Sequence, residues 1–294
     1  APEGSFIVTT DVMVEDQHFH LSWSTGYEVG ARVAAQNLAD IDAMGGRPSG
    51  LVASVVAPRD MDAEVFLDVV RGLGERAREV GAGVVGGDLS AGEKLVISIT
   101  AFGYCPGPIV RRDGAQPGDV IAVSGTLGFS YAGLDLLEGG YVDPSARGSE
   151  ELGDLAPFID TYRAPHPPLG SGVAAAAAGA TAMMDLSDGP AADARRMAQA
   201  SGLVIEFDRP ALEAEARLLQ VPAQVCQADP VWWVLQGGEE HGMLAAFPPN
   251  AVLPEGFRVV GRTRACRDGE TPAAMLGEEV LRGAWDHFDP ESVH

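Results

Sequence analysis

The stretch "MMDLSDGPAAD" (residues 183–193) joins an apolar run to a turn and then to polar sequence. The pattern predicts a buried strand, a Gly-Pro turn and a helix with Pro190 at its first position. Asp185 and Asp188 come at the end of the strand, whereas Asp193 falls inside the helix, where we expect it to be solvated. Two interpretations stay open. Asp188 caps the helix, or Asp185 and Asp188 form the mouth of a metal–phosphate site.

The same alternation of strand and helix runs along the whole chain of 294 residues. It favours an α+β protein with two α/β-type domains, an N-terminal one with a mixed sheet and a C-terminal α/β one. The polar, turn-forming segment 111–119 separates them, so we expect domains at 1–115 and 116–294. Predicted strands cover 5–15, 51–58, 83–88, 94–105, 120–125, 202–207, 242–247 and 257–263. Predicted helices cover 27–45, 60–80 with Asp60 as N-cap, 128–138, 170–180 and 190–201; segments 139–169 and 208–235 are loop-rich or poorly patterned.

The charge of the chain limits its partners. Forty-two acidic residues against 20 basic ones give a net charge of −22, which disfavours nucleic acid. Lys94 is the only lysine, so no GxxxxGK[ST] phosphate loop exists. A protein of this composition that binds nucleotides would need carboxylate-held metal ions and a few arginines.

Cysteine usage and hydropathy bear on the compartment. The three cysteines, Cys105, Cys226 and Cys266, are scattered, which fits neither a disulfide framework nor a metal knuckle and favours a reducing cytoplasm. No apolar run is long enough to span a membrane, and no secretion signal is seen, so we expect no membrane partner.

Aspartates recur where predicted strands end. Asp11 ends "FIVTTD", Asp88 ends "GVVGGD", and Asp185 ends another strand, while Asp40 lies on a helix in "NLADIDAMGG". A single aspartate after a strand is usually a turn or capping residue. Several such residues converging from different elements would instead hold more than one Mg²⁺ on a polyphosphate.

Seven motifs occur in the order and spacing of one known family. They are "TTD-x6-HF", "NLADIDAMGG", "GGD", "RRDGAQPGD", "MDLSDG", "GGEEHGML" and the terminal "WDHF". Through them the chain resembles the thiamine-monophosphate kinase family. That family belongs to the superfamily of aminoimidazole ribonucleotide synthetase, selenophosphate synthetase and the hydrogenase-maturation carbamoyl dehydratase.

The resemblance implies direct, in-line, Mg²⁺-assisted transfer of a phosphoryl group from ATP to thiamine monophosphate, giving thiamine diphosphate. It implies several Mg²⁺ ions, and a homodimer whose N-terminal sheets form a barrel. The implied catalytic residues are Asp11, Asp185 and Asp188. The implied metal ligands are Thr9, Thr10, Asp11, Asp40, Asp88, Asp185 and Asp188; the implied ATP contacts are Gly87, Asp88, Arg112 and Ser187; the implied substrate contacts are His18, Glu239 and Trp285.

Simpler interpretations exist for the substrate contacts. His18 would otherwise be a surface histidine, Glu239 a solvated acid in a Gly-Gly turn, and Trp285 part of the core. As a binding residue, Trp285 would offer an aromatic face to the cationic thiazolium ring, and Glu239 would add a negative charge. Asp42 and Arg111 are expected to be structural or solvated.

The chain departs from the family pattern in three places. The familiar Gly-Gly-Glu-Asp-aromatic-Glu-Leu reads here with Glu240, His241 and Gly242, which puts the role of Glu240 in question. Pro190 stands where Leu is usual, which alters the helix start. The family's front helix and Gly-Asp-Asp-Ala motif are absent from the sequence given, so we expect a preceding segment.

These departures leave two alternatives. One is another ATP-using chemistry of the superfamily, of the carbamoyl dehydratase or synthetase type. The other is a degenerate, non-catalytic nucleotide-binding protein.

Overall fold

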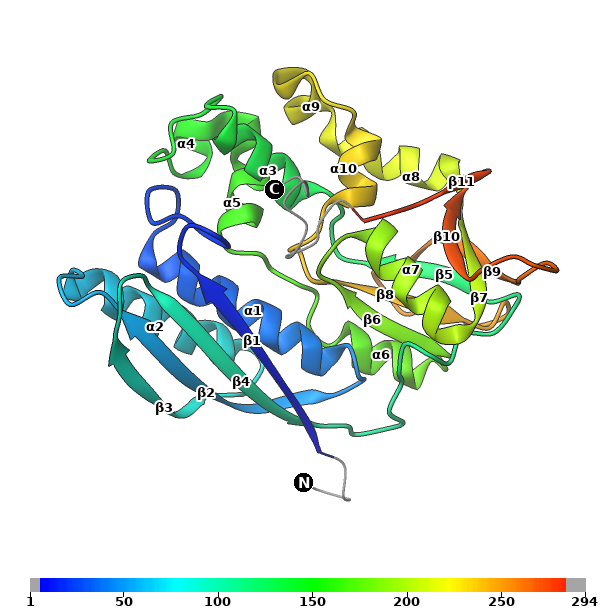
Figure 1. Ribbon diagram of the computed structural model, residues 1–294, viewed down its shortest axis with the longest axis horizontal. Helices are drawn as coiled ribbons and strands as arrows, with labels where there is room; N and C mark the ends of the chain where they lie inside the picture. Colours follow the sequence, from blue (N-terminus) through cyan, green and yellow to red (C-terminus); the bar gives the residue numbers. More distant parts are fainter. Residues whose placement is uncertain (1–5, 284–294) are drawn as a thin grey trace.

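The computed structural model describes residues 6–283, which form two β-sheets with helices packed on them (Figure 1). The first sheet has the order β1-β4-β2-β3. β2 and β3 are parallel and the other neighbours antiparallel, so the sheet is mixed, as predicted. Its strands are β1 (Ile7–Val14), β2 (Arg47–Ala57), β3 (Val84–Ala91) and β4 (Val96–Tyr104).

Helices α1 (Gly26–Asp42) and α2 (Ala63–Glu79) cover one face of this sheet. Val33 and Leu38 of α1 join Ile97 and Ile99 of β4 in one buried cluster, because alternate residues of a strand point to the same face. The N-cap of α2 is Asp62, whose side chain accepts a hydrogen bond from the backbone of Glu64. The prediction of Asp60 as the cap was therefore wrong by half a helical turn.

The second sheet has the order β11-β10-β7-β9-β5-β8-β6, and among the described strands of this sheet only β7 and β10 pair in parallel. The predicted domain boundary at 115/116 falls in the connection between β4 and β5 and stays a prediction. The strands are β5 (Val120–Ser124), β6 (Ala182–Leu186), β7 (Leu203–Phe207), β8 (Gly242–Phe247), β9 (Arg258–Ala265), β10 (Ala273–Leu276) and β11 (Glu279–Val280).

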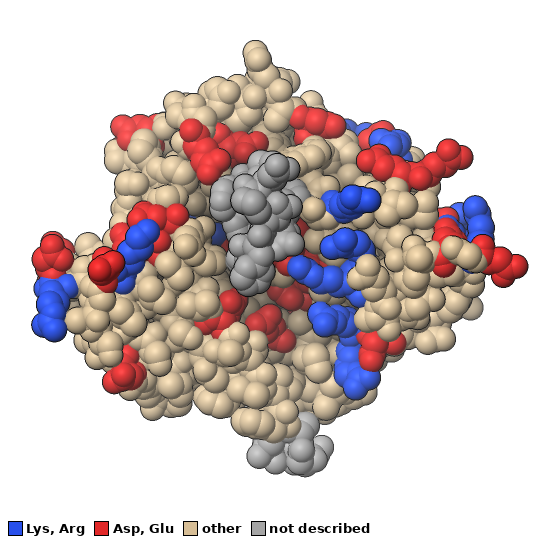
Figure 2. Space-filling model, viewed as in Figure 1, with Lys and Arg blue, Asp and Glu red and all other residues tan. Residues whose placement is uncertain are grey.

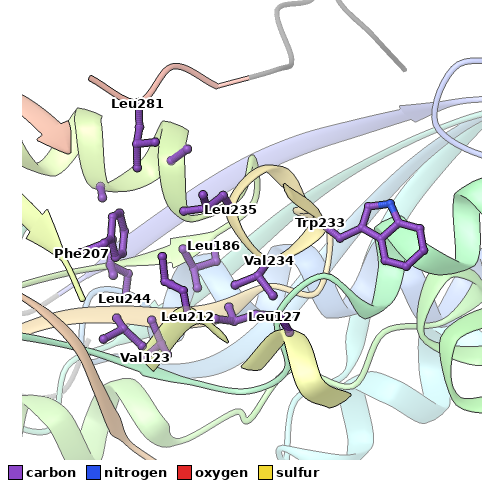
Figure 3. Close-up of a cluster of buried hydrophobic side chains, with 14 of the residues drawn as sticks. Val123, Leu127, Leu186, Phe207, Leu212, Trp233, Val234, Leu235, Leu244 and Leu281 are labelled. Carbon is purple, nitrogen blue, oxygen red and sulfur yellow. The ribbon is translucent and has the colours of Figure 1, made fainter. Parts of the chain in front are cut away.

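Helices cover both faces of the second sheet. On one face, Leu186 and Leu244 pack with Leu212, Val234 and other helical residues (Figure 3). On the other face, Met183 and Met243 pack with alanines of α6. The helices are α3 (Phe129–Glu138), α4 (Gly148–Leu152), α5 (Ala156–Arg163), α6 (Ser171–Ala177), α7 (Pro190–Ser201), α8 (Arg209–Ala216), α9 (Gln220–Cys226) and α10 (Pro230–Gln236).

Of the two segments predicted as loop-rich or poorly patterned, 208–235 is largely helical and 139–169 is about half helical. Segment 139–169 contains α4 and α5, and segment 208–235 contains α8, α9 and most of α10. These helices have five to eight residues, too few for a clear helical period in the sequence. None of the described helices is both long and apolar enough to span a membrane.

Candidate functional site

A cavity of about 700 Å³ lies between the two halves of the chain. Residues from β1 and the loop after it, from α1, and from α3 line it together with two loops of the second sheet. In Figure 2, acidic side chains gather near the centre of the face shown, and a row of basic side chains runs beside them. The lining residues include Asp11, His18, Arg32, Gln36, Tyr131, Glu138, Ser187, Asp188, Glu239 and His241.

Three predicted metal ligands from different elements approach one another here. The Thr9 hydroxyl donates to Oδ2 of Asp40 at 2.7 Å, which ties β1 to α1. Burial raises the pKa of Asp40 to about 7, and the negative charges of Asp185 and Asp11 add to this effect. Asp40 therefore lies close enough to Asp185 and to Asp11 to be repelled by both. Such repulsion is relieved by a bound cation.

The pleat of β1 separates the two predicted threonine ligands. Thr9 faces α1, as does Asp11, whose carboxylate accepts a hydrogen bond from Gln36. The Thr10 side chain lies on the other face and donates to the carbonyl oxygen of Ile99 at 3.0 Å. The Thr10 hydroxyl is therefore turned away from this site. Its backbone carbonyl oxygen is the other candidate ligand atom.

A buried histidine accompanies Asp185. The Nδ1 atom of His241 lies 3.2 Å from Oδ2 of Asp185. Burial opposes charge on this ring, but the hydrogen bond and charge of Asp185, with Glu239 and Asp40, raise the pKa of His241 to about 9. At neutral pH the imidazolium therefore neutralises part of the aspartate cluster. It stands where the family motif has an aromatic residue.

Two tight turns cross at the cavity wall. The backbone N–H of Glu239 donates to the carbonyl oxygen of Ser187 at 2.9 Å. A Cβ atom on Gly238 would lie 2.1 Å from that same oxygen, so only glycine permits the approach. Glu239 and His241 adopt left-handed backbone conformations, with φ of 70° and 53°, which are sparsely populated and typical of functional loops.

Asp193 is fully buried, so its predicted solvation is wrong. Its Oδ2 accepts the backbone N–H of Asp188 at 3.0 Å, and Arg196 donates to both carboxylates. Burial, with the charges of Asp188 and Asp185, raises the pKa of Asp193 to about 7. The N-cap of α7 is Gly189, which has no side-chain cap. Asp188 is thus oriented by Arg196 and Asp193 rather than used as a capping residue.

The two glutamates of "GGEEHG" have different partners. Glu239 pairs with the buried Arg32 of α1 at 2.9 Å. Although burial opposes it, the charge of Arg32 holds the pKa of Glu239 below its ordinary value. Glu240 accepts the backbone N–H of Ser130 at 3.1 Å and so caps α3, and burial raises its pKa to about 8. The longer acid at position 240 therefore has a structural role.

The remaining predicted residues lie in different places. His18 lines the cavity, and its Nδ1 accepts the Val14 N–H at 3.1 Å. Gly87 and Asp88 lie on the exposed strand β3, three strand spacings from β1, or about 14 Å. Arg112 is exposed in the connection between β4 and β5, and Trp285 lies outside the described residues.

Across residues 6–283, no group of three or more His, Cys, Asp or Glu side chains is positioned to hold a metal ion.

Asp42 and Arg111, which were expected to be structural or solvated, are so. Asp42 accepts backbone N–H groups at the start of α6, and the exposed Arg111 pairs with Asp113.

Sequence reasoning missed Arg32, Gln36 and Arg196. Arg32, Gln36 and Asp40 follow one another at intervals of four on α1, so they form a polar stripe on one face of a largely buried helix. That stripe was a signal available in the sequence.

Comparisons with known proteins show the family to which the chain is related. Residues 1–105 match the family model of the N-terminal domain of AIR synthase related proteins. The chain is 41% identical over 290 residues to the thiamine-monophosphate kinase of Mycobacterium tuberculosis, covering 98% of this chain and 82% of that protein. It is 37% identical to that of Corynebacterium glutamicum, covering 94% and 84%. The solved structure of AaThiL complexed with AMPPCP and TMP superposes with a TM-score of 0.81 at 29% identity, covering 96% and 87%.

Proposed function

This chain belongs to the thiamine-monophosphate kinase family, and we propose that it transfers the γ-phosphoryl group of ATP to thiamine monophosphate, forming ADP and thiamine diphosphate. The observation that carries the proposal is that Asp40 lies within electrostatic reach of both Asp185 and Asp11, the latter lining the cavity. Phosphoryl transfer needs positioning and charge neutralisation more than covalent chemistry. A rigid site built from two sheets supplies the positioning.

We propose that Mg²⁺ ions bind to Thr9, Thr10, Asp11, Asp40, Asp185 and Asp188. Hard oxygen donors suit Mg²⁺, which usually takes one or two carboxylates per ion and completes its shell with water and substrate phosphates. The raised pKa of Asp40 supports this, since it comes from burial and from the charges of Asp185 and Asp11, and a bound cation would counteract these effects. When bound, Mg²⁺ would neutralise charge on the transferring phosphoryl group. His241 and Arg196 orient Asp185 and Asp188 for this task.

On the nucleotide side, we propose that Ser187, Arg112, Gly87 and Asp88 contact ATP. Ser187 lines the cavity, where its backbone is fixed by Glu239. Gly87 and Asp88 lie apart from Asp11 within one chain, so their proposed roles, which for Asp88 include Mg²⁺ binding, require a second copy beside the first.

The proposed second copy forms a homodimer through the open face of the first sheet. This face and its edges leave apolar side chains exposed, among them Val8, Val12, Val85 and Leu89 at 43–71% exposure. An exposed apolar sheet surface of this kind is typical of a protein–protein interface, where a partner removes it from water.

We propose that the protein works in the cytoplasm. The three free cysteines support a reducing compartment of this kind.

For the acceptor, we propose contacts from His18, Glu239 and Trp285. Because Nδ1 of His18 accepts the Val14 N–H, the neutral ring carries its proton on Nε2. Glu239 acts with Arg32 as a pair. The positive charge of Arg32 therefore largely neutralises the negative charge of Glu239.

The test is an assay of ADP release by the full-length protein with ATP and Mg²⁺, using thiamine monophosphate or thiamine as acceptor. We expect turnover only with the monophosphate, loss of turnover on chelation, and recovery when Mg²⁺ is added back. Asp185→Asn should lower kcat by a factor of 100 or more, roughly the effect of one lost electrostatic stabiliser. The exposed Asp154→Asn is the matched control. No turnover with either acceptor would favour a non-catalytic protein or another chemistry of the superfamily.

A further inference from the structure

One face of α3 forms a wall of the cavity. Tyr131, Leu134 and Glu138 all line it, and their spacing of three and four residues places them on the same side of the helix. The wall thus combines an aromatic ring, an aliphatic side chain and a carboxylate. None of the three belongs to the aspartate cluster or to the predicted substrate contacts.

The Tyr131 ring is held in a defined orientation and stays uncharged. It meets Trp232 edge-on, with ring centroids 5.1 Å apart and an interplanar angle of 80°. Burial raises the pKa of Tyr131 to about 12, with further contributions from Asp135 and Glu138. A neutral, oriented ring of this kind offers its electron-rich face to a cation.

Glu138 supplies negative charge to the same wall. Glu138 lines the cavity together with Tyr131 and Tyr162, and its charge contributes to raising the pKa of both tyrosines. The predicted acidic contact, Glu239, is paired at 2.9 Å with Arg32, which also lies over the Tyr162 ring. Because Arg32 largely cancels the charge of Glu239, a cationic ligand needs another source of negative potential.

We infer that Tyr131, Leu134 and Glu138 bind the positively charged heterocyclic end of the acceptor. This inference rests on the proposed function, whose acceptor carries a thiazolium cation and a flat pyrimidine ring. Tyr131 provides the ring face, Leu134 apolar contact, and Glu138 the counter-charge. The wall therefore determines specificity for a cationic ring, while the aspartate cluster serves the phosphates.

Steady-state kinetics of the full-length protein test the inference. We expect Tyr131→Leu to raise KM for thiamine monophosphate about tenfold, which is within the range of one lost cation–π contact. Tyr131→Phe keeps the ring and should raise KM much less. Glu138→Gln should raise it several-fold, and KM for ATP should stay at the wild-type value in all three variants. The controls are Tyr141→Leu and Glu213→Gln, two exposed positions outside the cavity.

A calorimetric titration tests binding without turnover. The probes are thiamine monophosphate and a neutral isostere in which carbon replaces the quaternary ring nitrogen. The wild-type protein should prefer the cation, and Glu138→Gln should reduce that preference several-fold. Because Glu138 is exposed, this variant should fold normally. Equal preference in both proteins, or unchanged KM in Tyr131→Leu and Glu138→Gln, overturns the inference. A wild-type protein that binds as expected but fails to phosphorylate the monophosphate counts against the proposed function alone.

Discussion

Arg32 and Glu239 are 207 residues apart in the sequence, yet Nη2 of the arginine lies 2.9 Å from Oε2 of the glutamate. The arginine lies in α1, which packs on the first sheet, and the glutamate lies in the loop that precedes β8 of the second sheet. Nη1 of Arg32 also donates to the carbonyl oxygen of Tyr162 at 3.0 Å. One buried side chain therefore fixes a cavity loop against the other half of the molecule.

Removing this link should destabilise the protein. We expect Arg32→Met to lower the free energy of unfolding by about 1–3 kcal/mol, because a carbonyl and a half-buried carboxylate lose their donor. Chemical denaturation measures the change, with the exposed Arg59→Met as control. An unchanged unfolding midpoint in Arg32→Met would show that the pair does not hold the loop.

The crossing of the two turns predicts a strong effect of a single methyl group. In Gly238→Ala the new Cβ would meet the Ser187 carbonyl oxygen and the Asp188 Cα. We expect unfolding free energy to fall by about 1–3 kcal/mol and kcat to fall at least tenfold. Gly107→Ala, where a Cβ meets nothing within 4 Å, should behave as wild type. Equal kcat in the two variants would contradict the proposed role of Asp188 in Mg²⁺ binding.

Stability should decrease as pH rises through the neutral range. Glu240 has an ordinary pKa of 4.5 and a folded pKa of about 8, so between these values the folded state holds a proton that the unfolded state has lost. Folding is then favoured at low pH and weakens up to about pH 8. Asp193, with a pKa of about 7, acts in the same direction.

Glu240→Gln isolates the contribution of this residue. Denaturation at pH 5.5 and pH 8.5 should show a smaller loss of stability in Glu240→Gln than in the wild type. Glu213→Gln, at an exposed position, should keep the wild-type dependence. The same loss in all three proteins would mean that Glu240 does not titrate as described.

The open face of the first sheet predicts self-association. The wild-type protein should have twice the chain mass in light scattering, and Val8→Asp should shift it toward the monomer because the charge would be buried between copies. Val70→Asp, on the exposed side of α2, is the control. A monomeric wild type at micromolar concentration rules out the dimer.

Local patterns predicted most of the regular elements but not the contacts between them. Strands such as β4 and helices such as α1 were predictable because their apolar residues recur with a clear period. The short helices α4 and α9 carry no such signal. The burial of Asp193 could not be foreseen either, since a polar residue in the first turn of a helix ordinarily faces water. Partners such as Arg32 and Glu239 come together only through the packing of the two halves.

The most direct test of the central proposal is identification of the reaction products by ³¹P NMR. With ATP, Mg²⁺ and thiamine monophosphate, the full-length protein should form thiamine diphosphate and ADP in equal amounts, and Asp185→Asn should form far less of both. Release of ADP without thiamine diphosphate, or phosphorylation of thiamine but not of its monophosphate, would contradict the proposal.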